Sequence, residues 1–99
     1  MSITVIQIAA QPKRELAVVV REGRNETRHT VTVDPDTFRR LAGPSGASAA
    51  DFVRAVFEFL LEREPKESIL SRFDVTVVQR YFPEFESTIP NYLGKGEHP

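Results

Sequence analysis

The sequence predicts an α+β domain in which a small antiparallel sheet is covered on one face by helices. Three short runs rich in β-branched residues lie in the first third of the chain, at about residues 3–8, 15–21 and 27–33. All the aromatic residues except Phe38 lie between Phe52 and Tyr92, where apolar side chains recur at helical spacing. This spacing predicts inward positions for Phe52, Phe57, Phe59, Phe73 and Phe82, which should cover the sheet. Strand patterns followed by helical patterns are typical of α+β folds.

The three runs predict an antiparallel β-meander. Residues 16–20 are apolar on both faces, which favours a central strand. Residues 27–33 alternate, with His29, Val31 and Val33 on one face, so this strand should be half buried. Segments with Pro, Gly and Asn separate the runs and are typical of turns.

Four helices are expected after the meander, at about residues 35–41, 49–63, 66–73 and 75–89. Asp34 followed by Pro35 predicts the start of the first helix, and Ser48 predicts the cap of the second. The β-branched residues 75–78 are also compatible with a fourth strand. Helix is favoured there, because Gln79 interrupts the alternation that a strand would continue.

Length and composition indicate one domain, residues 1–93, with a disordered tail over residues 94–99. The absence of cysteine excludes disulfides, thiolate metal sites and cysteine nucleophiles. No apolar run approaches the ~20 residues of a membrane span, and the N-terminus lacks the basic start of a signal peptide. We therefore expect a cytoplasmic protein that is not bound to a membrane.

The sequence contains no catalytic motif, and we expect no enzyme activity, no cofactor and no metal site. His29 is the only histidine before the C-terminal tail, and no second ligand stands at metal-binding spacing, so it should be structural. Glu84 and Glu86 are a conceivable acid–base pair around Phe85. Glutamates that alternate with a buried aromatic residue are more typical of an amphipathic surface.

Protein–protein contact or self-association is the function that the sequence favours. The strongest patterns all explain folding, so only sheet edges and surplus aromatic residues remain for binding. The partner is not identified by the sequence. The predicted contact surface comprises Arg80, Tyr81, Glu84, Phe85 and Tyr92.

A nucleic-acid-binding regulator is the alternative. Two short helices within residues 67–82 would resemble a helix-turn-helix, with Thr76, Gln79 and Arg80 directed to a groove. The connector is too short for that motif, and the net charge of −1 gives no attraction for phosphates. Nucleic acid is therefore not favoured as a partner.

Residues 58–86 read EFLLEREPKESILSRFDVTVVQRYFPEFE. This stretch resembles segments of small uncharacterised bacterial proteins. The resemblance carries no assigned activity, so no functional residue is transferred from it. It implies only that this part of the chain, about a third of its length, is a recurring structural unit.

Overall fold

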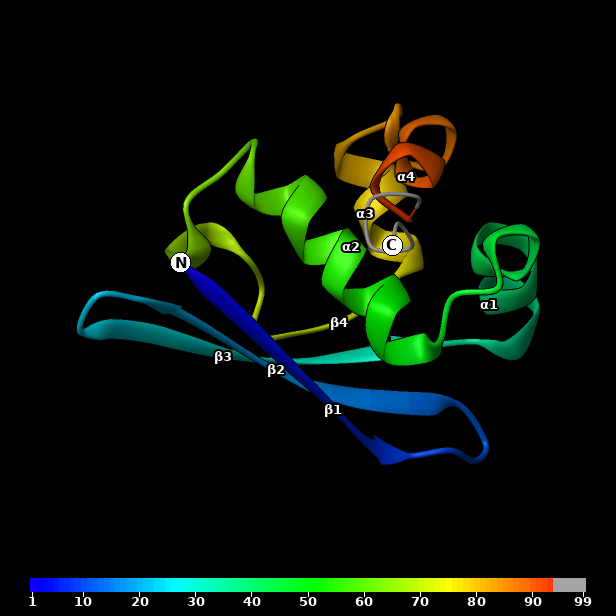
Figure 1. Cartoon of the computed structure of the whole chain (residues 1–99), viewed down its shortest axis with the longest axis horizontal. Helices are drawn as coiled ribbons and strands as arrows, with labels where there is room; N and C mark the ends of the chain where they lie inside the picture. The colour runs from blue at the N-terminus through cyan, green and yellow to red at the C-terminus, as the bar shows by residue number, and fades with distance from the viewer. Residues whose placement is uncertain (94–99) are drawn as a thin grey trace, which may run out of the picture.

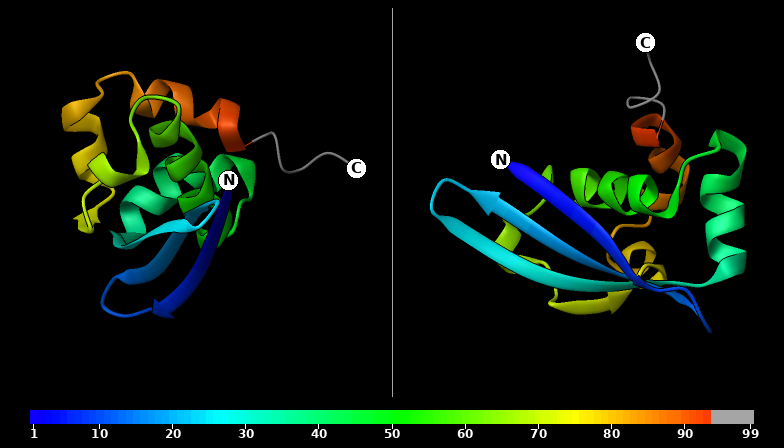
Figure 2. Two further views of the ribbon diagram at one scale, coloured as in Figure 1. Left: turned by 90° about the vertical axis from the view of Figure 1, so that its left-hand side faces the viewer. Right: turned by 60° about the horizontal axis from the view of Figure 1, so that its bottom comes forward.

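The computed structural model describes residues 1–93, which form one α+β unit around a four-stranded sheet. The helices lie on one side of the sheet, and its other face is uncovered (Figure 1). Both views in Figure 2 keep this one-sided arrangement. The expected tail, residues 94–99, lies outside the described residues. No helix in residues 1–93 is long and apolar enough to cross a membrane.

The antiparallel meander expected from the sequence is present. It consists of β1 (Ser2–Ala9), β2 (Arg14–Glu22) and β3 (Asn25–Val33). The prediction that β2 is central is confirmed, because β2 pairs with β1 on one side and β3 on the other. The β2–β3 hairpin turns at Gly23, whose φ of 61° is accessible to glycine without a Cβ clash.

The helix expected at residues 66–73 is absent, and that prediction was wrong. The segment forms a 3₁₀ turn, η2 (Lys66–Ser68), and then a short strand, β4 (Arg72–Asp74), which pairs parallel with β3. Two backbone bonds frame β4: Thr30 N–H donates to Ser71 O at 2.8 Å, and Val75 N–H donates to Thr32 O at 3.0 Å. The exposed edge of β3 needed backbone partners, and this pairing supplies them.

The first two helices are confirmed, with their predicted caps. Helix α1 (Pro35–Ala42) begins where Asp36 N–H donates to the Asp34 carboxylate at 3.0 Å, and it continues into a 3₁₀ turn, η1 (Gly43–Ser45). Helix α2 (Ala49–Leu61) begins where Asp51 N–H donates to Ser48 Oγ at 3.1 Å. Both side chains satisfy a backbone donor that has no partner within the helix.

The helix expected at residues 75–89 is two helices, α3 (Thr76–Tyr81) and α4 (Phe85–Leu93). Residues 76–78 are helical, as the sequence favoured. The chain leaves the helix at Phe82, whose φ and ψ are −132° and 87°. Pro83 explains this break, because a proline disfavours helical geometry in the residue before it and has no N–H to donate.

Helix α2 is the centre of the hydrophobic core. It crosses the sheet diagonally and lies beneath α4 in Figure 1. On its sheet side it covers fully buried residues of β2 and β3, namely Leu16, Val18, Val20, Val31 and Val33. On its other side, the Phe59 ring lies 5.2 Å from the Phe85 ring. The predicted inward positions of Phe52, Phe57, Phe59 and Phe73 are confirmed, and Phe82 is half buried.

Asp74 joins β3, β4 and α3 through one carboxylate. Its Oδ1 accepts from the Thr32 hydroxyl at 2.7 Å, and its Oδ2 accepts from the Thr76 hydroxyl at 2.7 Å and the Thr76 N–H at 3.1 Å. Burial alone would raise the pKa of the Asp74 carboxyl. The hydrogen bonds from Thr32 and Thr76 outweigh burial, so the pKa lies below its ordinary value.

We expect the Asp74 charge to stabilise the fold in a pH-dependent way. A carboxyl whose pKa is lower in the folded state stabilises it above the unfolded-state pKa of about 4, and this is lost as the pH falls through the folded-state pKa. Asp74→Asn should therefore reduce the free energy of unfolding near pH 7 and have less effect below about pH 4. Urea denaturation at a series of pH values measures this.

Asp51→Asn is the control, because Asp51 is also in a first helical turn but its side chain is exposed. It should lower the free energy of unfolding at pH 7 less than Asp74→Asn does, because no hydrogen bond from Thr32 or Thr76 depends on it. Asp74→Ala should cost more than Asp74→Asn, about 1–2 kcal/mol at neutral pH, because alanine removes every acceptor for the bonds from Thr32 and Thr76. An Asp74→Asn effect of equal size at pH 3 and pH 7 would contradict this account.

Candidate functional site

The five residues predicted as a contact surface are divided between the surface and the core. Tyr81 is 68% exposed at the end of α3, and Arg80 beside it is also exposed. Glu84 is exposed in the break between α3 and α4. The side chains of Phe85 and Tyr92 are only 1% and 8% exposed, so they belong to the core cluster. Arg80, Tyr81 and Glu84 are therefore the members available to a partner.

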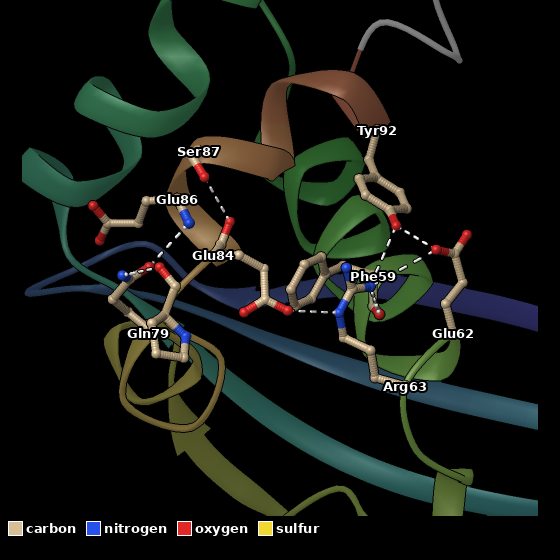
Figure 3. Close-up of polar contacts among 9 residues, drawn as sticks. Phe59, Glu62, Arg63, Gln79, Glu84, Glu86, Ser87 and Tyr92 are labelled. Atoms are coloured by element: carbon tan, nitrogen blue, oxygen red, sulfur yellow. Dashed lines mark hydrogen bonds and ion pairs between the residues drawn. The ribbon is translucent and has the colours of Figure 1, made fainter.

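Arg63, just after the end of α2, holds Glu84 and Tyr92 in place (Figure 3). Its guanidinium carbon lies 3.6 Å from the centroid of the Phe59 ring. Its Nε donates to Glu84 Oε2 at 3.1 Å, and its Nη1 donates to the Phe59 carbonyl at 3.0 Å and to the Tyr92 hydroxyl at 3.4 Å. A cation stacked on an aromatic ring and bonded at its rim is fixed in one orientation.

The Arg63 contacts shift the pKa values of the groups involved. The bond with Tyr92 raises the pKa of Arg63, burial opposes this, and Glu84 adds to the rise. The pKa of Glu84 is lowered by a bond from its own backbone N–H and by Arg63. Tyr92 donates its hydroxyl proton to Glu62. This network joins the C-terminal end of α2 to α4 and has a structural role. Its members, Glu62, Arg63, Glu84 and Tyr92, are called the Arg63 clasp below.

Gln79 closes the break between α3 and α4 (Figure 3). Its Nε2 donates to the Pro83 carbonyl at 2.6 Å, and its Oε1 accepts from Glu86 N–H at 2.9 Å. Thr76 is bonded to Asp74 as described above. Of the three residues proposed to contact nucleic acid, only Arg80 has its side chain free of a hydrogen bond or ion pair within residues 1–93.

Residues 67–82 do not form the two helices that the nucleic-acid alternative requires. They contain part of η2, the strand β4 and the single short helix α3. A helix-turn-helix needs a first helix to position the second in the groove. That geometry is absent from this segment.

His29 has the structural environment that its isolation in the sequence predicted. Its Nδ1 lies 2.8 Å from the Leu70 carbonyl oxygen, and its Nε2 lies 2.8 Å from the Thr27 hydroxyl. The ring is buried, 5.2 Å from the ring of Phe57. Both ring nitrogens are thus engaged, and His29 ties the segment before β4 to β3.

The conceivable acid–base pair is also engaged in separate contacts. Glu84 is bonded to Arg63, whereas Glu86 accepts from Arg40 of α1 at 2.7 Å and 3.3 Å. The two carboxylates thus serve different ion pairs. Within the part of the chain that is described, no group of three or more His, Cys, Asp and Glu side chains could hold a metal ion.

Besides Arg80, Tyr81 and Glu84, two further surfaces formed by residues 1–93 could bind a partner or ligand. The first is the uncovered sheet face beside the edge strand β1, where Ile6 and Ile8 are 59% and 55% exposed. The second is a groove of about 390 Å³ between the end of α2, the segment before β4, and α3. Leu60, Glu64, Ser68, Ile69, Leu70, Phe73, Val77, Val78, Tyr81 and Phe82 line it.

Comparison with known proteins found no matching family model, no similar curated protein and no similar solved structure. The resemblance of residues 58–86 to small bacterial proteins therefore stays a prediction.

Some of these features were accessible from sequence. Arg63 lies four residues after Phe59 and so on the same side of a helix, a spacing that favours side-chain contact. The charge-free β1 segment can also be read directly from the sequence. The groove has no local signal, because its walls come together only when β4 pairs with β3.

The Arg63 clasp should depend on a planar guanidinium. Arg63→Lys keeps the charge but removes the stacked plane and the multiple donors, so it should lower the free energy of unfolding by roughly 1–2 kcal/mol. Arg80→Lys is the matched control, since Arg80 is exposed on α3, and it should have almost no effect. Thermal or urea denaturation measures both. Equal effects of the two substitutions would contradict the clasp.

Proposed function

We propose that this chain is a non-enzymatic cytoplasmic protein that acts by self-association, through addition of β1 of one copy to β1 of another. The observation that carries the proposal is that β1 is an edge strand with no charged side chain from Ser2 to Ala9. Natural edge strands are normally protected by charges, proline or a cover. Pairing of such an edge with another strand is a common mode of recognition.

The hydrogen-bonding pattern of the sheet identifies the free groups of β1. Thr30 of β3 directs its N–H towards β4, so its partner Ala17 in β2 directs its backbone groups towards β1. Ala17 pairs with Ile6, whose backbone therefore points towards β2. The neighbours Val5 and Gln7 then point their N–H and C=O groups away from the sheet.

Part of the edge is already covered. Arg54 of α2 donates to the carbonyl of Ile3, and the register between β1 and β2 shifts between Gln7 and Ala9. A bulge and a capping side chain both oppose strand addition. Among the described residues, none bonds to the outward groups of Val5 and Gln7, so this short stretch is the open part of the edge.

A two-fold axis at Ile6 uses this open stretch in full. In an antiparallel pairing of two copies, Val5 of one lies opposite Gln7 of the other. Each of these two pairs of Val5 and Gln7 exchanges two N–H to C=O bonds, so the contact has four backbone hydrogen bonds in total. Ile6 then lies directly opposite Ile6 of the second copy, in the closely spaced type of pair. Ile3, whose carbonyl accepts from Arg54, lies outside the paired stretch.

The uncovered sheet face beside β1 supplies apolar area to such a contact. Ile6 pairs directly with the half-buried Ala17 of β2, and the half-buried Val19, two residues along β2, lies on the same face. Farther across the face, charged side chains form ion pairs. Arg21 pairs with Glu26 at 2.9 Å, Arg28 also pairs with Glu26, and Arg72 pairs with Glu15. Apolar surface buried on association contributes roughly 25 cal/mol per Å² before the costs of ordering.

Several contacts support a non-enzymatic role. The ring nitrogens of His29 and the carboxylates of Glu84 and Glu86 are held in structural contacts, as described above. The surface Arg80, Tyr81 and Glu84 remains a second place where a partner could bind. The β1 edge is favoured over it, because a free edge presents backbone donors and acceptors that have no internal partner.

A charge exchange at Ile6 tests the proposal. Ile6→Lys and Ile6→Glu should each weaken self-association at least about tenfold, because like charges would face each other across the axis. An equimolar mixture of the two variants should associate again, because lysine then faces glutamate. Sedimentation velocity over a concentration series measures all three samples and the wild type.

Ser2→Lys is the control, since Ser2 is exposed on the same strand but lies outside the open stretch. It should associate like the wild type. A wild-type chain that stays monomeric at every concentration would contradict self-association. Association that survives in Ile6→Lys would contradict the β1 surface, and a mixture that fails to recover would contradict the Ile6 register.

A further inference from the structure

The groove beside α3 differs from the β1 edge in place and in chemistry. It is formed on the helical side of the molecule, near β4, which is the opposite edge of the sheet from β1. Most of its lining is apolar, with Phe73 and Val78 at its buried side and the more exposed Leu70 and Tyr81 at its rim. The groove therefore has a buried apolar lining and an opening that is accessible to solvent.

Among the described residues, Glu64 is the only charged one in the lining of the groove. Burial raises the pKa of its carboxyl, and nothing offsets this. No hydrogen bond or ion pair to its carboxylate is formed within residues 1–93. Its acidic neighbours are paired: Glu62 accepts from Tyr92, and Glu67 accepts from Lys66 at 2.6 Å.

A half-buried carboxylate without a partner is a cost to the fold. Partial removal of a charge from water is unfavourable unless an opposite charge or a hydrogen-bond donor replaces the water. A ligand that brings a cation to Glu64 removes this cost on binding. A neutral or anionic ligand of the same shape does not.

We propose that this groove binds a small apolar amine, with its alkyl or aryl part against Phe73, Val77 and Phe82 and its ammonium group against the Glu64 carboxylate. Ser68 and Tyr81 also line the groove, and a hydroxyl group can accept an ammonium proton. Charge-assisted bonds of this kind are about twice as strong as neutral ones.

The size of the groove favours a small molecule over a protein segment. Its volume of about 390 Å³ lies within the usual range for small-ligand pockets, roughly 300–1,000 Å³. A stable protein interface needs about 800 Å² from each partner, far more than this lining offers. The geometry of a mainly apolar wall with one polar anchor is typical of ligand sites.

Three probes of equal chain length test the charge preference. We expect n-octylammonium to bind more tightly than octan-1-ol, and octan-1-ol more tightly than octanoate, because Glu64 attracts only the first and repels the last. Titration of isotopically labelled protein, followed through its amide NMR signals, gives the affinities. Saturable shifts should centre on residues 69–82, which carry most of the lining.

Glu64→Gln should weaken n-octylammonium binding roughly tenfold and leave octan-1-ol binding unchanged. Glu58→Gln is the matched control: Glu58 lies on α2 but outside the lining, so its loss should change neither affinity. The Glu64→Gln substitution removes a partly buried charge, so this variant should fold at least as well as the wild type at neutral pH.

Either of two results would overturn the proposal: no saturable shift at the groove with n-octylammonium, or equal affinities for the three probes on the wild-type protein. The comparison of probes requires no substitution, so it holds even if a variant folds poorly. Because the groove and the β1 edge are separate, the outcome is independent of whether the chain self-associates.

Discussion

The burial of α2 between the sheet and α4 is the contact on which the other elements depend. One face of the sheet consists of aliphatic residues from β2 and β3 that must be removed from water, and α2 is the helix that crosses them. Its second side then needs a cover, which α4 provides through Phe85, Ile89 and Tyr92. Removal of this apolar surface from water is the main favourable contribution to folding.

Local patterns predicted the elements that local interactions determine. Alternation in residues 27–33 and the caps at Asp34 and Ser48 were sufficient for β3, α1 and α2, because each depends on neighbours along the chain. The segment 66–73 could not be predicted in this way. A three-residue strand is too short to show a period, and β4 exists because β3, distant in sequence, offers it a partner.

The aromatic residues show the same limit. Spacing assigned Phe52, Phe57 and Phe59 to the core correctly, since they lie on one continuous helix. Phe85 and Tyr92 were expected at the surface, but Pro83 ends α3 and lets α4 turn back over α2. The direction of the chain after such a break depends on tertiary contacts, among them the stacking of Arg63 on Phe59.

The strand order places the two ends of the sheet under different constraints. β1 has an open stretch at residues 5–7, whereas β4 has three residues and pairs parallel to its neighbour. If β1 of one copy pairs with β1 of a second copy about a two-fold axis, the open stretch of both copies is used in the same contact. The proposed assembly is then closed at two copies, because the open stretch of β1 is used in both. An open filament would require a second edge that complements β1, whereas the proposed two-fold contact uses the same edge in both copies.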